Sequence, residues 1–68
     1  MPMQVFINGE PREIAEGATV ASLVASLALE PSRVAVELER EVIRRADWSG
    51  RTITPGARLE IVHFVGGG

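Results

Sequence analysis

The stretch MQVFING, residues 3–9, sets how the chain begins to fold. Its alternate apolar residues have the period of a β-strand that turns one face towards a core. Asn8-Gly9 then gives the strongest short signal for a hairpin turn, because both residue types tolerate positive φ. We expect residues 11–15 to return as an antiparallel strand, with Pro11 at its start or at a sheet edge, since proline has no backbone donor. The inward residues of the first strand are Met3, Val5 and Ile7.

A helix is expected after the break at Gly17. Thr19 is a residue type that caps helix N-termini, and it stands directly before an apolar pattern of helical period. The pattern recurs at i, i+3, i+4 and i+7 and forms one stripe: Val20, Leu23, Val24 and Leu27. The helix should end by residue 29 or 30, because Pro31 disfavours a helical conformation in the residue before it.

The second half of the chain predicts three more strands. Residues 34–38 alternate in polarity, with Val34, Val36 and Leu38 facing inward. A polar turn at 39–41 leads to a short strand candidate at 42–45. The last strand is expected at 58–65, with Leu59 and Ile61 as its inward pair.

Two turns are expected between the short strand at 42–45 and the last strand at 58–65. Residues 47–50 are interpreted as an irregular turn in which Trp48 closes one end of the core. Residues 54–57 predict a type II β-turn, because proline stands at the second position and glycine at the third.

The element order is therefore hairpin, helix, strand, short strand, turn and strand. One main helix packed on one face of a mixed sheet of four to five strands is the smallest core that such a list can build. The first and last strands can pair in parallel at the sheet centre, with the helix in the crossover. This predicts an α+β, β-grasp (ubiquitin-like) domain at residues 1–65 and a flexible glycine tail at 66–68.

The amino-acid composition argues against several classes of function. The 68 residues include no cysteine and one histidine, which excludes disulfides, thiol chemistry and a histidine-rich metal site. The net charge of −2, with acidic residues around the arginines, argues against nucleic-acid binding. No apolar run approaches the roughly 20 residues of a membrane helix, and no signal-peptide pattern is present. We expect a cytoplasmic protein without a metal, nucleic-acid or membrane partner that is a monomer when free.

The side chains suggest no catalytic group. The serines lack the context of a nucleophile elbow. His63, late in the last predicted strand, is interpreted as a partly exposed structural residue, and the carboxylates as solvated surface. The terminal glycines precede no helix, so they do not form a phosphate-binding loop. The candidate for chemistry that remains is the carboxyl terminus.

The glycine tail follows directly on the last predicted strand. Glycine has no Cβ, so a Gly67-Gly68 end is the thinnest possible peptide and can pass through a narrow tunnel in a partner. A carboxylate is a poor electrophile until it is activated, for example by adenylation with ATP. The acyl-adenylate can then accept a sulfur, oxygen or nitrogen nucleophile. An inert, frayed end is the alternative, but exit from the expected central strand favours a functional tail.

The alternation of the last strand also predicts a docking surface. If Leu59 and Ile61 face inward, the residues between and after them face the other side of the sheet. Phe6 should face the same side from the neighbouring strand. Exposed apolar patches of this kind mark docking sites. The predicted patch at the root of the tail consists of Phe6, Val62 and Phe64, with Val65 and Gly66 adjoining. The alternative is a smaller patch, or one that the loop around Trp48 covers.

These features together resemble the ubiquitin-like sulfur carriers, most closely the ThiS family of thiamine (thiazole) biosynthesis. The resemblance covers essentially the whole chain, and the length together with the Gly-Gly end is its most specific part. The third glycine, Gly66, is a departure that lengthens the tail and leaves the terminal pair intact. The matching residues are 3–9, Gly17 to Val20 with Leu23, Val36, Val42, Arg44, Trp48, Pro55-Gly56 and Gly67-Gly68.

The resemblance implies a protein co-substrate that is not an enzyme and binds no cofactor itself. A ThiF-type adenylating enzyme would use ATP and Mg²⁺ to activate the Gly68 carboxylate. A sulfur donor (a cysteine desulfurase or persulfide protein) would then supply sulfur for a C-terminal thiocarboxylate. Thiazole synthase would take up that sulfur. Gly67 and Gly68 are implied as the functional pair, with Phe6, Val62 and Phe64 as docking surface.

Three alternatives remain open from the sequence. The same chemistry could serve another pathway, as in the molybdopterin synthase small subunit. The chain could be a β-grasp binding module with an inert tail. It could also be a modifier that is joined through Gly68 to lysines of other proteins.

Overall fold

The structure, a computed structural model, describes residues 1–65, and the expected tail at 66–68 lies outside the described residues. The strands of the described part are β1 (Pro2–Ile7), β2 (Glu10–Ala15), β3 (Val34–Leu38), β4 (Glu41–Ile43) and β5 (Arg58–His63). Its helices are α1 (Val20–Ser26) and two short 3-10 helices, η1 (Pro31–Arg33) and η2 (Arg45–Gly50). None of these helices is long and apolar enough to cross a membrane.

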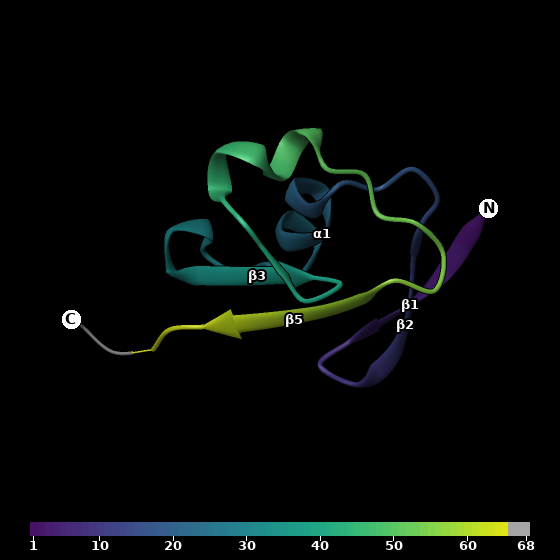
Figure 1. Cartoon of the computed structure of the whole chain (residues 1–68), viewed down its shortest axis with the longest axis horizontal. Helices are drawn as coiled ribbons and strands as arrows, with labels where there is room; N and C mark the ends of the chain where they lie inside the picture. Colours follow the sequence, from purple (N-terminus) through teal and green to yellow (C-terminus); the bar gives the residue numbers. More distant parts are fainter. Residues whose placement is uncertain (66–68) are drawn as a thin grey trace.

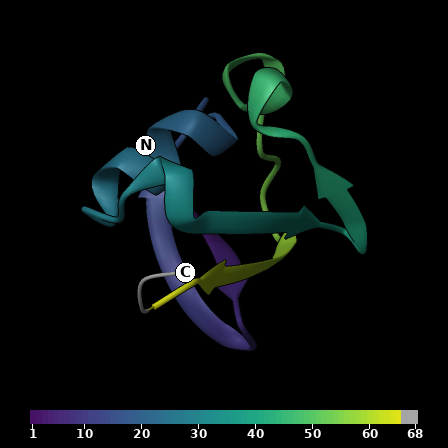
Figure 2. The same ribbon diagram turned by 90° about the vertical axis from the view of Figure 1, so that its left-hand side faces the viewer.

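The strands form one mixed sheet in the order β2-β1-β5-β3-β4, which places β5 in the centre, between β1 and β3 (Figure 2). β1 and β5 pair in parallel, and β5 pairs antiparallel with β3. α1 lies over one face of this sheet (Figure 1). The predicted β-grasp architecture, with the first and last strands side by side at the sheet centre, is therefore confirmed.

The β1–β2 hairpin forms as the sequence predicts. Asn8 and Gly9 have φ values of 52° and 84°, so both central turn residues are in the left-handed region that this turn requires. β2 pairs antiparallel with β1 and has no second neighbour in the sheet. Pro11 thus lies on an edge strand, where the ladder with β1 does not need the backbone N–H that proline lacks.

α1 begins where the sequence places its N-cap. The Thr19 side chain accepts a hydrogen bond from the Ser22 backbone N–H at 3.1 Å, and the Ser22 hydroxyl accepts one from the Thr19 N–H at 2.9 Å. This reciprocal capping box satisfies two backbone donors at the helix start. The helix ends at Ser26, before the limit that Pro31 sets, and Ala28 follows with a positive φ of 58°.

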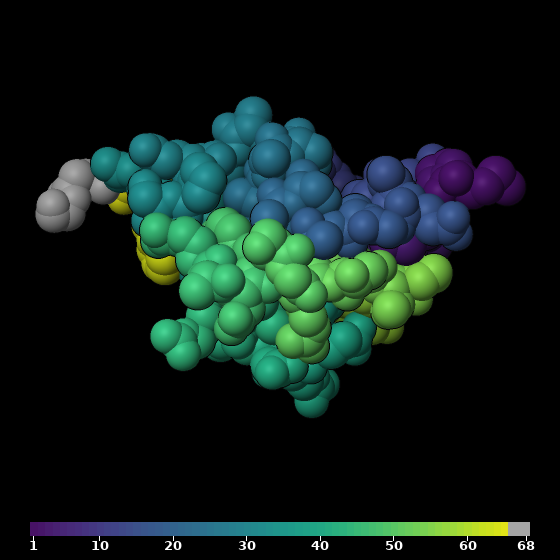
Figure 3. Space-filling model, turned by 90° about the horizontal axis from the view of Figure 1, so that it is seen from above, coloured from purple at the N-terminus to yellow at the C-terminus, as the bar shows by residue number. Residues whose placement is uncertain are grey.

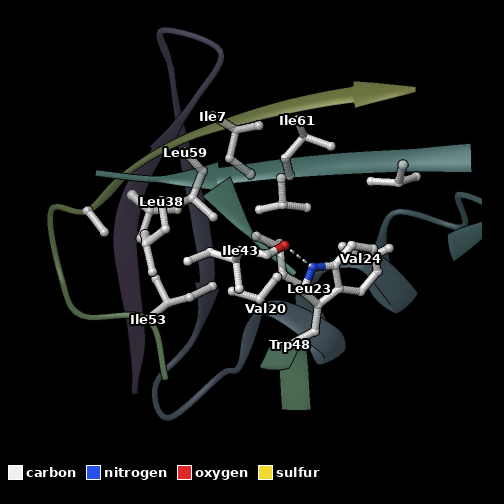
Figure 4. Packing of buried hydrophobic residues seen from close by; sticks show 14 of the residues in the cluster. Ile7, Val20, Leu23, Val24, Leu38, Ile43, Trp48, Ile53, Leu59 and Ile61 are labelled. Carbon is white, nitrogen blue, oxygen red and sulfur yellow. Dashed lines mark hydrogen bonds between the residues drawn. The ribbon is translucent and has the colours of Figure 1, made fainter. Parts of the chain in front are cut away.

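Several expected boundaries differ from the structure, and β1, β2 and β4 each begin one residue earlier than expected. β4 ends at Ile43 rather than residue 45, and residues 45–50 form η2 rather than an irregular turn. The Trp48 indole N–H donates to the Ile43 carbonyl at 2.9 Å, which holds η2 against the end of β4 (Figure 4). β5 ends at His63 rather than residue 65, because β3 begins at its partner Val34 and offers no further ladder residue.

The core lies between the sheet and the layer formed by α1 and η2. Figure 3 shows these two helices side by side over this face of the molecule. Trp48 is buried there, as the sequence predicts, and closes one end of the core. The buried cluster contains the predicted inward residues of the strands and of the helix stripe, except Leu27, which is half-buried. Its members are Met3, Val5, Ile7, Val20, Leu23, Val24, Val34, Val36, Leu38, Ile43, Trp48, Ile53, Ala57, Leu59 and Ile61.

Candidate functional site

The candidate site begins where β5 leaves the sheet. After His63 the main chain makes one more hydrogen bond on the β3 side: the Phe64 N–H donates at 2.7 Å to the carbonyl of Arg33, the last residue of η1. Val65 follows and is 87% exposed. The central strand therefore leads directly to residues 66–68, where the sequence predicts the chemistry. Gly66, Gly67 and Gly68 themselves lie outside the described residues.

The apolar residues at this exit face solvent. Val62 and Phe64 are 51% and 57% exposed, on the face of β5 that α1 does not cover. Val65 follows Phe64 and is more exposed than either of them. We call Val62, Phe64 and Val65 the tail-root patch. Trp48 is buried in the core on the opposite face of the sheet, so the loop around it does not cover the patch.

Phe6 does not belong to the tail-root patch, so the expectation of one continuous surface is wrong at this residue. The register of the parallel pair places Phe6 beside Arg58, which leaves Val62 about 13 Å further along β5 at the rise of a strand. The Arg58 guanidinium lies 5.5 Å from the centre of the Phe6 ring, within cation–π range, and Phe6 is half-buried. Alternation put Phe6 on the correct face, but the register separates it from the tail.

Acidic side chains lie on the outer face of the sheet between Phe6 and the tail-root patch. Glu37 of β3 stands directly opposite Glu60 of β5, and Val42 of β4, 66% exposed, stands opposite Glu37. Neither carboxylate has an ion-pair partner among the described residues. Like charges at directly opposed positions repel each other. Alternation in the sequence gives the face of a residue but not its partner on the next strand, so it could not predict this pair.

Asn8 is a second residue whose role near the exit was missed. Its side-chain Nδ2 donates to the Ile61 carbonyl at 3.0 Å, and its Oδ1 accepts from the Ile61 N–H at 2.8 Å. The two residues are 53 positions apart. The turn signal at Asn8-Gly9 was visible in the sequence, but nothing local could reveal this contact with β5.

The described residues hold no other candidate for chemistry. Residues 1–65 contain no group of three histidine, aspartate or glutamate side chains placed to bind a metal ion. His63 lies exposed at the end of β5. The site is thus a surface of the central strand that leads to the glycine tail.

Comparison with known proteins gives the family. The model of the ThiS family matches residues 5–68. The crystal structure of a thiamine biosynthesis protein (ThiS) from Geobacter metallireducens is similar to this chain with a TM-score of 0.83 and 33% identity, over 97% of this chain and 100% of that one. An NMR solution structure of a thiamine biosynthesis protein from the same organism gives the same TM-score and identity, over 88% of that chain.

Two curated relatives are much longer. Proteins named thiazole synthase, from Magnetococcus marinus and Paramagnetospirillum magneticum, are 35% and 36% identical to this chain over 66 residues. Those residues are 97% of this chain and 20% of each relative. The chain therefore spans about a fifth of the length of the curated relatives it matches.

Proposed function

Because this chain belongs to the ThiS family, the sulfur carriers of thiamine biosynthesis, we propose that its Gly68 carboxylate is the group that carries sulfur. The family is one of carrier proteins without catalytic activity of their own. The carrier is then a co-substrate, and the chemistry at its terminus is performed by partner enzymes. The observation that carries this proposal is the exit of the central strand β5 into the glycine tail through an exposed apolar root.

The proposed cycle has three steps. A ThiF-type adenylating enzyme, with ATP and Mg²⁺, joins the Gly68 carboxylate to AMP and releases pyrophosphate. The terminal sulfur of a persulfide, which a cysteine desulfurase supplies, then displaces AMP and forms an acyl disulfide. A thiol reductant cleaves the sulfur–sulfur bond of this disulfide and leaves a C-terminal thiocarboxylate. Thiazole synthase accepts this sulfur, and the carrier returns to the carboxylate form. ATP and Mg²⁺ belong to the adenylating enzyme in this cycle, not to the carrier.

The tail-root patch is the proposed docking surface for these enzymes, together with Gly66. Val62, Phe64 and Val65 are exposed apolar side chains directly before the tail. Docking through them would place the tail at the partner's active site, and burial of their apolar surface would favour the complex.

The two longer relatives support thiazole synthase as the acceptor. Each is named thiazole synthase and includes a region similar to almost the whole of this chain. A carrier-like region in the same polypeptide as a synthase is held at a high effective concentration near it. For the separate carrier, we infer that docking on a thiazole synthase achieves the same proximity.

The test measures the intact mass of the carrier after incubation with its host's adenylating enzyme, ATP, Mg²⁺, a persulfide source and a thiol reductant. The expected result is a mass increase that corresponds to replacement of one oxygen by sulfur. Omission of ATP should prevent it, and so should deletion of Gly67-Gly68. Addition of thiazole synthase with its other substrates should then reverse the increase.

A matched control separates chemistry from folding. The deletion variant should retain the circular dichroism spectrum and melting temperature of the intact chain, because the buried cluster lies entirely within residues 3–61. An unchanged mass of the intact carrier, with an adenylating enzyme that is active on another ThiS protein, would overturn the proposal. The inert-tail binding module would then be the better interpretation.

A further inference from the structure

The side chain of Asn8 acts as an additional peptide group in the β1–β5 ladder. The main chain of β1 makes the preceding bonds: the Phe6 N–H donates to the Ala57 carbonyl and the Asn8 N–H to the Leu59 carbonyl, each at 2.9 Å. At Asn8 the backbone turns away into the hairpin. The carboxamide then offers one donor and one acceptor to Ile61, the next β5 residue on that side.

This contact fixes the last part of β5 from the β1 side. From the β3 side, the Arg33 carbonyl holds the Phe64 N–H at 2.7 Å. β3 also pairs with β5 as far as His63, so the end of β5 is held along its β3 side and, on its β1 side, by Asn8. Residues 65–68, which include the proposed carrier group at Gly68, span at most about 14 Å when fully extended. The point and direction in which β5 ends therefore limit the positions that the Gly68 carboxylate can reach.

We propose that Asn8 is a positioning residue for the carrier chemistry, because its carboxamide holds β5 at Ile61 and so directs the terminal carboxylate towards the partner's adenylation site. This inference rests on the proposed function. The turn alone does not require asparagine, since glycine adopts the φ of 52° found here without strain. Aspartate also tolerates this conformation, but it has no donor for the Ile61 carbonyl.

Two variants separate the contact from the turn. Asn8→Gly keeps a residue suited to positive φ and removes the carboxamide. Asn8→Asp keeps the acceptor for the Ile61 N–H, but places a carboxylate oxygen against the Ile61 carbonyl oxygen. The matched control is Arg40→Gly, which introduces glycine at another positive-φ turn residue, with φ of 70°, in the β3–β4 turn.

The experiment measures steady-state adenylation with the carrier as the varied substrate, at a temperature where circular dichroism shows each variant folded. For Asn8→Gly we expect kcat to fall about tenfold, because loss of two hydrogen bonds lets the root leave the productive direction. KM should stay within about twofold, since the tail-root patch is unchanged. Asn8→Asp should lose at least as much kcat, and Arg40→Gly should match the wild type.

Amide hydrogen exchange gives an independent readout of the contact. In Asn8→Gly the Ile61 amide should exchange faster, while the amides of the β1–β2 ladder keep their protection. If this exchange rises and kcat is unchanged, the contact has only a structural role and the inference is wrong. A higher KM at constant kcat would assign Asn8 to docking and would also overturn it. Failure of the wild type to be adenylated would refute the proposed function, and this inference with it.

Discussion

The two faces of β5 differ sharply in exposure, although their residues are close in sequence. Leu59 and Ile61 are 1% and 8% exposed and pack beneath α1, whereas Val62 and Phe64 are 51% and 57% exposed. All four residues are apolar and lie within six consecutive positions, with Phe64 directly after the end of β5. The pleat of the strand alone assigns one pair to the core and the other to solvent.

This difference separates folding from binding along a single strand. Substitutions of inward residues should change the free energy of unfolding, and substitutions of outward residues should change the affinity for partners. A small domain has little surface to spare, so a central strand that serves both purposes is economical. If the two roles are as separate as the exposures indicate, substitutions on the two faces should have distinct effects on unfolding and on binding.

The largest expected effect is on the inward face. Leu59→Ala should lower the free energy of unfolding by about 2–5 kcal/mol, because it removes buried methyl groups and leaves a cavity in the core. Urea denaturation followed by circular dichroism measures this change. A loss below about 1 kcal/mol would show that the inward face of β5 contributes little to the core.

A smaller effect on stability alone is expected at the start of α1. Thr19→Ala removes the side-chain acceptor for the Ser22 N–H and should cost about 1 kcal/mol. Affinity for the adenylating enzyme, measured by titration calorimetry below the melting temperature, should not change, because Thr19 lies away from the tail-root patch. Weaker binding by this folded variant would place part of the docking surface on the helical face.

The smallest expected effect is on the outward face. Val62→Ser should weaken binding to the adenylating enzyme roughly threefold to fivefold, because a half-exposed apolar side chain no longer contributes area to the interface. Val42→Ser is the matched control, since Val42 is an exposed valine on the same outer face but lies two strands from β5. Equal losses in the two variants would refute a docking surface centred on the tail root.

Local sequence patterns were sufficient for most of the fold. The inward residues of β1 follow from alternation, the hairpin from Asn8-Gly9, and the helix start from Thr19. In each case the physical cause acts within a few residues. The 3-10 helix η2 was not predicted because it depends on a hydrogen bond from Trp48 to Ile43, which forms only when the core closes.

The site was less predictable because it depends on strand register. Alternation placed Phe6, Val62 and Phe64 on one face, but it contains no information on how β1 aligns with β5. In the structure Phe6 therefore lies beside Arg58 and away from the tail root. The contact between Asn8 and Ile61 has the same origin, since it joins residues that are distant in sequence. The roles proposed for Gly66, Gly67 and Gly68 still depend on the family and on the sequence.

The most direct test of the central claim, that partners dock on the outward face of β5, is amide hydrogen exchange of the carrier with and without its adenylating enzyme. We expect added protection for the peptides that contain residues 62–65, while α1 and η2 exchange as in the free protein. Added protection confined to α1 and η2, with residues 62–65 unaffected, would show that partners dock elsewhere.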